Sequence, residues 1–361
     1  MTTPGWRVLW GVGFVAGALY LIRLGAAPFV DPPEGLHAEI AREMLAWGDW
    51  ITPRFNGVRY FDKPPLLYWL LAGGFWLVGV SEWTARLWSA LATVGTAVLT
   101  AWIGWRLHSE RAGLIAGLIV AANLEYFVFG RLVKQDALFV FFIWAVFAAF
   151  LAAYQGVGRW TLFIAYGSLG LTMLAKDILG AVGPVTVVAI FFVLTRERQI
   201  RVQWLPWAGV AMFLAVALPW YLAVEWRNRG FLWYTVVDNH VLSFIQQRIY
   251  PDEDVSLTAL EFLVVTALGF FPWSLAVPQA LVRVFRRPWE SVEDRWWLLL
   301  GLWSTLVLTF FTLSPFKLPH YGLPAFPALA LLVGRLWDDT LEGKRSSPSS
   351  RSLLLPPLVA L

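Results

Sequence analysis

The sequence predicts an all-α, polytopic membrane protein with about 10–11 transmembrane helices. Hydrophobic residues make up 58% of the 361 residues, charged residues only 14%, and the mean hydropathy is +0.62. Such values are typical of a multi-spanning membrane protein and lie outside the range of soluble domains. The 23 tryptophans fit the aromatic belts that form at both surfaces of a bilayer.

Composition also excludes several classes of site and partner. The chain has no cysteine, so it has neither disulfides nor thiolate metal sites. Its net charge of +4 is small and spread along the chain, which argues against a nucleic-acid partner.

Apolar runs recur along the whole chain, so we expect one multi-spanning domain over residues 1–361. The first run is followed by Arg23 and Pro28 instead of a small-residue cleavage site, which indicates an uncleaved span. Residues 353–361 begin one more run and stop, so we expect the chain to be truncated there. The other runs cover about 8–22, 66–80, 87–105, 112–129, 137–155, 161–175, 178–195, 205–225, 259–282, 296–313 and 321–337.

The run at 66–80 decides the topology. If it crosses the bilayer, the basic turns at 106–111, 196–201 and 283–295 fall on the side opposite Arg7, against the positive-inside rule. The run is short and contains three glycines, so an interfacial or re-entrant helix is the better interpretation. We therefore expect a cytoplasmic N-terminus, ten complete crossings and a cut eleventh, with a first outer loop over about 24–86.

With this topology, ionisable side chains from five loops gather on the outer face. Such residues are costly at the ends of membrane spans unless they line a wet cavity or serve a site. Their convergence predicts a functional site on that face. They are Asp31, Glu34, Arg59, Asp62, Lys63, Lys134, Asp136, Lys176, Asp177, Asp238, His240, Lys317 and Tyr321.

The first outer loop begins with two acids and continues into an amphipathic helix predicted over about 34–47. We expect this helix to lie on the membrane surface. Asp31 and Glu34 stand where it starts. Each either caps the helix and its dipole or is the carboxylate base that deprotonates an acceptor hydroxyl or amine.

The outer cations also allow two interpretations. Arg59, Lys63 and Lys317 either extend to the lipid headgroups or bind a phosphate or diphosphate. The two prolines after Lys63 stiffen the backbone there. Lys176 and Asp177 interrupt an apolar run, either as a same-face ion pair or as part of the site.

Two further residues remain open between structure and function. Asp136 opens the span that starts at residue 137 and either caps that helix or serves the site, and His240 in the late outer loop is either structural or a ligand. No phosphate-binding glycine loop, zinc-protease helix motif or nucleophile elbow is present. The signal is collective: the acids and the four cations Arg59, Lys63, Lys176 and Lys317, all at headgroup level, suit a lipid phosphate whose tail lies in the bilayer.

Three segments of the first loop resemble the lipid A aminoarabinose transferases, a group within the protein-mannosyltransferase-like family of membrane glycosyltransferases with the GT-C fold. Weaker matches follow in order along essentially the whole chain. The segments are Ala38-Glu39-Ile40-Ala41-Arg42-Glu43-Met44, Gly48-Asp49-Trp50-Ile51-Thr52-Pro53-Arg54-Phe55-Asn56-Gly57 and Tyr60-Phe61-Asp62-Lys63-Pro64-Pro65; the later matches are Pro219-Trp220, His240 with Phe244, Phe271-Pro272-Trp273, and Lys317-Leu318-Pro319 with Tyr321.

This resemblance implies a transferase that takes a sugar from a polyprenyl-phosphate carrier on the outer face, with inversion at the sugar. It implies an aspartate of the first loop as base, Lys63 and Tyr321 as contacts of the carrier phosphate, and Asp136 near the donor sugar. It also implies that Asp62 and His240 can hold a divalent cation; no other cofactor is implied.

The chain departs from the family pattern at two positions. The acidic pair of the relatives reads Pro33-Glu34 here, so Asp31 or Glu34 has to supply the base. The arginine that follows the late-loop histidine by three residues is Ser243 here. Both changes put a lipid A acceptor in doubt, and the C-terminal periplasmic domain of longer relatives lies outside this chain.

The sequence therefore predicts an enzyme of the bacterial inner membrane with its site on the periplasmic face. It moves a sugar from a polyprenyl-phosphate donor to a lipid A-like or other envelope acceptor, with Asp31 or Glu34 as base and Arg59, Lys63, Lys176, Lys317 and Tyr321 at the phosphate.

Two alternatives stay open. A protein O-glycosylase on the same fold differs only in its acceptor, whereas a transporter or flippase for an anionic lipid would show internal repeats, of which the sequence shows none.

Overall fold

The computed structural model describes residues 5–30, 32–158, 160–196, 207–250, 255–286 and 288–343. Across these residues the fold is helical except for one hairpin, in which β1 (Arg54–Phe55) pairs antiparallel with β2 (Val58–Arg59). The predicted all-α class is confirmed.

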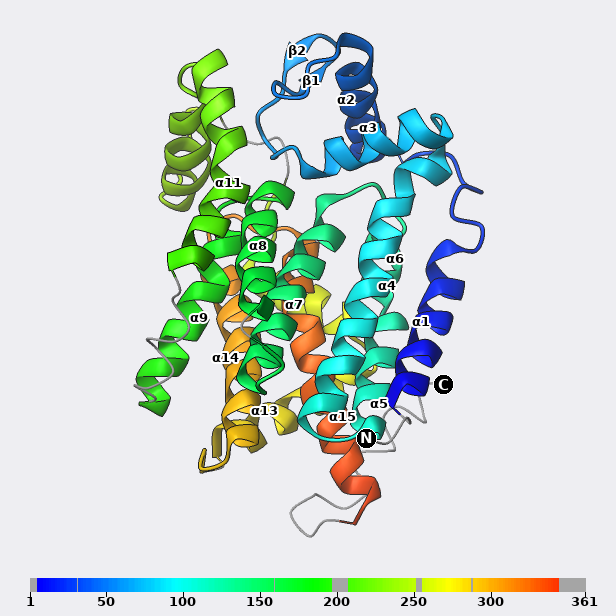
Figure 1. The fold of residues 1–361 in the computed structure, drawn as a ribbon, viewed down its shortest axis with the longest axis vertical. Coiled ribbons are helices and arrows are strands. Elements are labelled where there is room, and N and C mark those ends of the chain that lie inside the picture. The colour runs from blue at the N-terminus through cyan, green and yellow to red at the C-terminus, as the bar shows by residue number, and fades with distance from the viewer. Residues whose placement is uncertain are drawn as a thin grey trace.

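Most helices run along the long axis of the molecule in a single bundle (Figure 1). Shorter elements lie at its ends or interrupt it: α2 (Pro33–Trp47), α3 (Leu66–Val78), the π-helix η1 (Trp233–Leu242) and the 3₁₀ helices η2 (Trp273–Ala276) and η3 (Pro319–Ala325). The bundle helices are α1 (Gly5–Leu21), α4 (Glu82–Leu107), α5 (Glu110–Ala121), α6 (Leu124–Phe129), α7 (Gln135–Tyr154), α8 (Trp160–Ala175), α9 (Leu179–Thr195), α11 (Trp207–Arg227), α12 (Ala259–Gly269), α14 (Val292–Leu313) and α15 (Phe326–Leu341). Helix α13 (Val277–Arg286) is bent sharply away from the axis of α12.

Several of these helices have the length and hydropathy of membrane spans. In the described part of the chain α4, α7, α11 and α14 qualify alone, and α12 with the segment 273–286 qualifies as one span bent by 108°. The helices α1, α8 and α9 are apolar but shorter. Breaks between α5 and α6 and between α12 and α13 explain why unbroken runs in the sequence appear as shorter helices.

Helix α3 does not run with the bundle. It has 13 residues, and it lies with α2 and the hairpin at the end of the molecule away from the N-terminus (Figure 1). At the opposite end, Gly5 packs against the ring of Trp105, and His108 contacts Glu293. The N-terminal end and the basic turns at 106–111 and 283–295 therefore share one end, as the sequence predicts, while residues 197–201 of the third basic turn lie outside the described residues.

Small residues let the bundle helices approach closely. A Cβ atom on Gly113 in α5 would lie only 2.4 Å from the carbonyl oxygen of Ala101 in α4. Such close backbone contact is the usual basis of helix association in membranes. In the turn between these helices, Ser109 caps α5 by accepting a hydrogen bond from the amide of Ala112.

A buried ion pair fastens the first outer loop to the bundle. Glu34, at the start of α2, accepts two hydrogen bonds from Arg86 in α4, Nε to Oε1 at 2.8 Å and Nη2 to Oε2 at 2.7 Å. The amides of Val30 and Val133 donate to the same carboxylate at 2.8 and 2.9 Å. Arg86 in turn donates to three carbonyl oxygens of residues 24–28. One pair therefore joins the loop, α2, α4 and the turn before α7.

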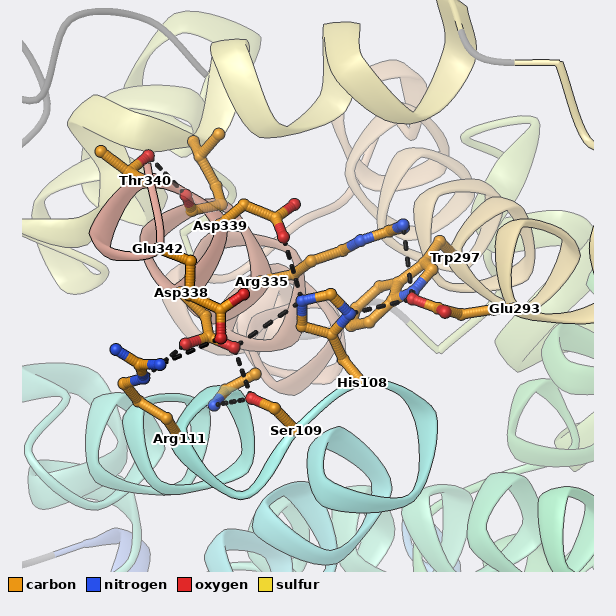
Figure 2. A network of polar contacts seen from close by, with 12 residues as sticks. His108, Ser109, Arg111, Glu293, Trp297, Arg335, Asp338, Asp339, Thr340 and Glu342 are labelled. Atoms are coloured by element: carbon orange, nitrogen blue, oxygen red, sulfur yellow. Dashed lines mark hydrogen bonds and ion pairs between the residues drawn. The ribbon is translucent and has the colours of Figure 1, made fainter. Parts of the chain in front are cut away.

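A second polar network ties the helices together at the other end of the bundle (Figure 2). His108, in the turn after α4, lies 2.9 Å from Glu293 of α14 and 3.1 Å from Asp339 of α15. Asp338 and Asp339 are buried, and each also pairs with an arginine of another helix. Those partners are Arg111 for Asp338 and Arg283 for Asp339, and Arg335 bridges to Glu293 and Asp294.

Loss of one member of the Glu34–Arg86 pair should destabilise the protein strongly. Arg86→Ala leaves a buried carboxylate without its counter-charge, and we expect a loss of about 3–5 kcal/mol. The double variant Arg86→Met/Glu34→Met should recover part of that loss, because neither charge is then buried alone. Arg42→Ala, which removes the exposed pair with Glu39, should cost about 1 kcal/mol or less. Reversible unfolding in mixed micelles measures all three; equal losses for Arg86→Ala and Arg42→Ala contradict this account.

The network around His108 should make stability depend on pH. Hydrogen bonds with Asp339 and Glu293 raise the pKa of His108 from 6.5 to about 9, against the opposing effect of burial. Because the pKa is raised in the folded state, the stabilisation is complete below pH 6.5 and is lost as the pH rises through 9. Thermal unfolding between pH 6 and 10 should show this decline in the wild type and a flatter profile in His108→Phe. A wild-type profile as flat as that of the variant would contradict it.

Candidate functional site

A cavity of about 470 Å³ opens among the outer loops and the bundle. Its walls come from the loop before α3, the start of α7, the α8–α9 turn, α11, η1, the end of α14 and η3. Aromatic and aliphatic side chains form much of the lining, and charged side chains gather within it. The charged or polar lining residues are Asp62, Lys63, Lys176, Asp177, Thr235, Asn239, His240, Ser243, Arg248, Ser314 and Tyr321.

Lys63 enters this cavity from the loop between the hairpin and α3. Its Nζ donates to Asp62 Oδ2 at 3.1 Å, and the hydroxyl of Tyr234 lies 3.4 Å from Asp62 Oδ1. Burial on its own lowers the pKa of Lys63, but the charge of Asp62 outweighs it and holds the pKa well above its ordinary value. Asp62 shifts the other way, because the charge of Lys63 outweighs burial and keeps its pKa low. Both groups are therefore ionised at neutral pH.

Lys176 enters the cavity from the turn between α8 and α9. Its Nζ lies 2.5 Å from Asp136 Oδ1 and 4.6 Å from the centre of the Tyr321 ring. Asp136, buried in the first turn of α7, also lies 3.6 Å from His320 Nε2. The Asp136 carboxylate therefore pairs with the Lys176 ammonium, and the cation–π contact with Tyr321 holds that ammonium over the ring.

Helix η1 and the segment that follows it bring two more polar side chains to the cavity. His240 lies with its Nδ1 2.6 Å from the carbonyl oxygen of Thr235. Arg248 follows η1 in the chain, and its Nη2 donates to Asn239 Oδ1 at 2.5 Å. The sequence did not single out Arg248. No periodic pattern runs through residues 243–250, so nothing in the sequence indicated that this segment folds back on η1.

His37 is a second residue that the sequence did not single out. It lies on the buried face of α2, with Nδ1 3.3 Å from the Tyr68 hydroxyl and 3.5 Å from Gln135 Nε2. Burial and the charges of Lys134 and Lys63 lower its pKa from 6.5 to about 3. A neutral imidazole thus packs α2 against the first turn of α7, next to Asp136.

The other sequence-predicted residues that the structure describes lie away from the cavity lining. Glu34 is held in the pair with Arg86, because its carboxylate already accepts four hydrogen bonds. Arg59 lies on the exposed strand β2, and the buried Lys317 turns its Nζ to the carbonyl oxygen of Leu257 at 3.4 Å. Asp31 lies outside the described residues.

Asp62 and His240, the pair that the resemblance implies for a divalent cation, line the same cavity. Among the residues that the structure describes, no three His, Cys, Asp or Glu side chains group closely enough to hold a metal ion. Lys63 already donates to Asp62, and His240 directs Nδ1 at a backbone carbonyl. As they stand, these donors do not fit a metal ion.

Comparison with known sequences gives one consistent group of relatives. A sequence model of the dolichyl-phosphate-mannose-protein mannosyltransferases matches residues 34–235. The undecaprenyl phosphate-alpha-4-amino-4-deoxy-L-arabinose arabinosyl transferase 2 of Sodalis glossinidius is 32% identical over 90% of this chain and 59% of its own length. The corresponding transferase of Aeromonas salmonicida is 31% identical over 93% of this chain and 61% of its own length. The chain thus spans about three fifths of these relatives.

Solved structures agree with this grouping. The crystal structure of ArnT from Cupriavidus metallidurans bound to undecaprenyl phosphate matches 99% of this chain and 64% of its own, with a TM-score of 0.83 and 29% identity. An oligosaccharyltransferase from Archaeoglobus fulgidus, tethered with an acceptor peptide, covers 99% of this chain and 53% of its own, with a TM-score of 0.60 and 14% identity. The second likeness shows the fold alone. The resemblance and the GT-C fold predicted from the sequence are confirmed.

Proposed function

We propose that this chain, which belongs to the dolichyl-phosphate-mannose-protein mannosyltransferase family, transfers a sugar from a polyprenyl-phosphate carrier to an acceptor. One observation carries the proposal: Lys63, Lys176 and Tyr321 line a single cavity whose remaining walls are largely apolar. A phosphate requires cations, and a polyprenyl tail requires apolar surface. The similarity to arabinosyl transferases that use an undecaprenyl-phosphate sugar supports the same donor class.

The proposed chemistry is a displacement at the anomeric carbon of the sugar. The acceptor oxygen or nitrogen attacks that carbon, the bond to the phosphate oxygen breaks, and its electron pair stays on the phosphate. Lys63 and Lys176 neutralise the charge that develops there, as preorganised electrostatic groups do at other transition states. Asp136 keeps Lys176 in place, and we retain the prediction that it lies near the donor sugar.

The acceptor proton requires a base, and we propose Asp31. Glu34 is the less suitable acid, because Arg86 and two backbone amides already occupy its carboxylate. Those contacts also hold the pKa of Glu34 below its ordinary value despite burial, so Glu34 is a weak proton acceptor. A general base works best with a pKa near the working pH and within hydrogen-bond reach of the acceptor.

We further propose a bacterial inner-membrane location with the cavity on the periplasmic face and the N-terminus in the cytoplasm. The cavity-lining loops lie at the end opposite the N-terminus (Figure 1), and the basic turns at 106–111 and 283–295 lie at the N-terminal end. This charge distribution follows the positive-inside rule. The proposed acceptor is a lipid A-like or other envelope lipid, in keeping with the relatives; a protein acceptor is the alternative on this fold.

Removal of either cavity lysine should slow transfer by the folded protein. Lys176→Ala also leaves the buried Asp136 without its counter-charge and should destabilise the protein, so its rate is compared per folded molecule. For Lys63→Ala or Lys176→Ala we expect kcat to fall by roughly a hundredfold to a thousandfold, as when one preorganised donor to a developing oxyanion is removed. Arg227→Ala removes an exposed cation that pairs with Asp49 outside the cavity, and it should transfer at nearly the wild-type rate. The assay follows a radiolabelled sugar from a polyprenyl-phosphate pool into membrane acceptors. Purified Lys63→Ala working at the wild-type rate would refute the proposed role of this lysine.

A further inference from the structure

We propose that Arg248 is a third cation of this cavity and binds the carrier phosphate together with Lys63 and Lys176. The inference rests on the proposed function and deepens it, since it assigns a binding residue outside the first loop. Arg248 lines the same cavity as the two lysines, but it reaches the cavity from the segment after η1. The three cations therefore approach one space from three separate parts of the chain.

The fold of residues 243–250 brings Arg248 to this position. After η1 the chain reverses at Gln246, which has a φ of 58°, and the amide of Gln247 donates to the carbonyl oxygen of Leu242 at 2.8 Å. The amide of Ile249 then donates to Asp238 Oδ1 at 2.7 Å. These contacts fold the segment back onto η1, so Arg248 comes to lie beside the residues that η1 contributes to the cavity.

Acidic and amide groups of η1 orient the guanidinium. Nη2 donates to Asn239 Oδ1 at 2.5 Å, and Nε lies 3.5 Å from Oδ2 of the fully buried Asp238. The Arg248 side chain is only 11% exposed. Arg248 is also close enough for its charge to help lower the pKa of Asp62, the partner of Lys63. Its charge therefore acts on the pair that Asp62 forms with Lys63 in the cavity.

Chemistry favours an arginine for this task. A guanidinium presents its donors as a planar fork that matches phosphate oxygens, while an ammonium acts as a point charge. Lys63 and Lys176 provide two point charges, and Arg248 adds the directional donor. Ser243, earlier in the same segment, lines the same cavity. An arginine substituted at position 243 can therefore bring a guanidinium back to the cavity when Arg248 has been replaced.

Binding of a phosphate lipid and of its uncharged alcohol separates this role from simple bracing of the loop. Farnesyl phosphate and farnesol are titrated against purified protein in nanodiscs. We expect Arg248→Ala to weaken farnesyl phosphate binding by about tenfold to a hundredfold and to leave farnesol binding unchanged. Ser243→Arg in the Arg248→Ala background should restore part of the affinity, and Arg248→Lys should retain more affinity than Arg248→Ala because it keeps the charge.

Other outcomes overturn the inference in distinct ways. If Arg248→Ala binds farnesyl phosphate as tightly as the wild type, or loses both lipids equally together with thermal stability, Arg248 only braces the segment after η1. If Arg248→Ala fails to fold, Arg248→Lys decides: we expect weaker binding of farnesyl phosphate with farnesol binding unchanged, whereas an equal loss of both lipids overturns the inference. A wild type that binds the phosphate no better than the alcohol refutes the proposed function itself.

Discussion

The buried pair between Glu34 and Arg86 is the contact on which the outer half of this protein depends. It joins α2 to α4, and it also holds the residues that precede α2 and the turn that precedes α7. Those segments carry the first loop and Asp136 into the region of the cavity. Both oxygens of the Glu34 carboxylate accept hydrogen bonds, and the Arg86 guanidinium also donates to three carbonyl oxygens. These hydrogen bonds offset the free-energy cost of burying the two charges.

Each cation of the cavity has an acid behind it. Lys63 contacts Asp62 at 3.1 Å, Lys176 contacts Asp136 at 2.5 Å, and Arg248 contacts Asp238 at 3.5 Å. In a space partly shielded from water, an isolated lysine tends to lose its proton, and a paired lysine keeps it. An arriving phosphate then replaces a carboxylate as the partner of a cation that is already charged. In the same arrangement each acid positions its cation. This explains why acids lie so close to the cations in a site that binds an anion.

Much of the architecture could be predicted from the sequence because long apolar runs and the positive-inside rule act on every span alike. The exclusion of residues 66–80 from the bundle followed from that rule, and α3 lies at the end of the molecule as expected. Lys63, Lys176, Tyr321, Asp62 and His240 were predicted on one face and line one cavity. The sequence could not show side-chain direction, so Lys317 and Arg59, on the same face, were assigned to the site although neither lines the cavity. Nor could it pair Glu34 with Arg86, 52 residues later, since a partner that far away leaves no local pattern. The contact of residues 243–250 with η1 could not be predicted either, because it also leaves no local pattern in the sequence.

The most direct test measures sugar transfer and thermal stability together for the wild type, Asp31→Asn and Glu34→Gln. The transfer assay uses membranes supplied with a radiolabelled polyprenyl-phosphate sugar. The account predicts that Asp31→Asn keeps wild-type stability and carrier binding but loses transfer, while Glu34→Gln loses stability first and transfer only in proportion to the folded fraction. A stable Glu34→Gln that binds the carrier and transfers nothing, beside an active Asp31→Asn, would make Glu34 the base and contradict the structural role of its pair with Arg86. Carrier binding without any transfer by the wild type would favour a lipid transporter.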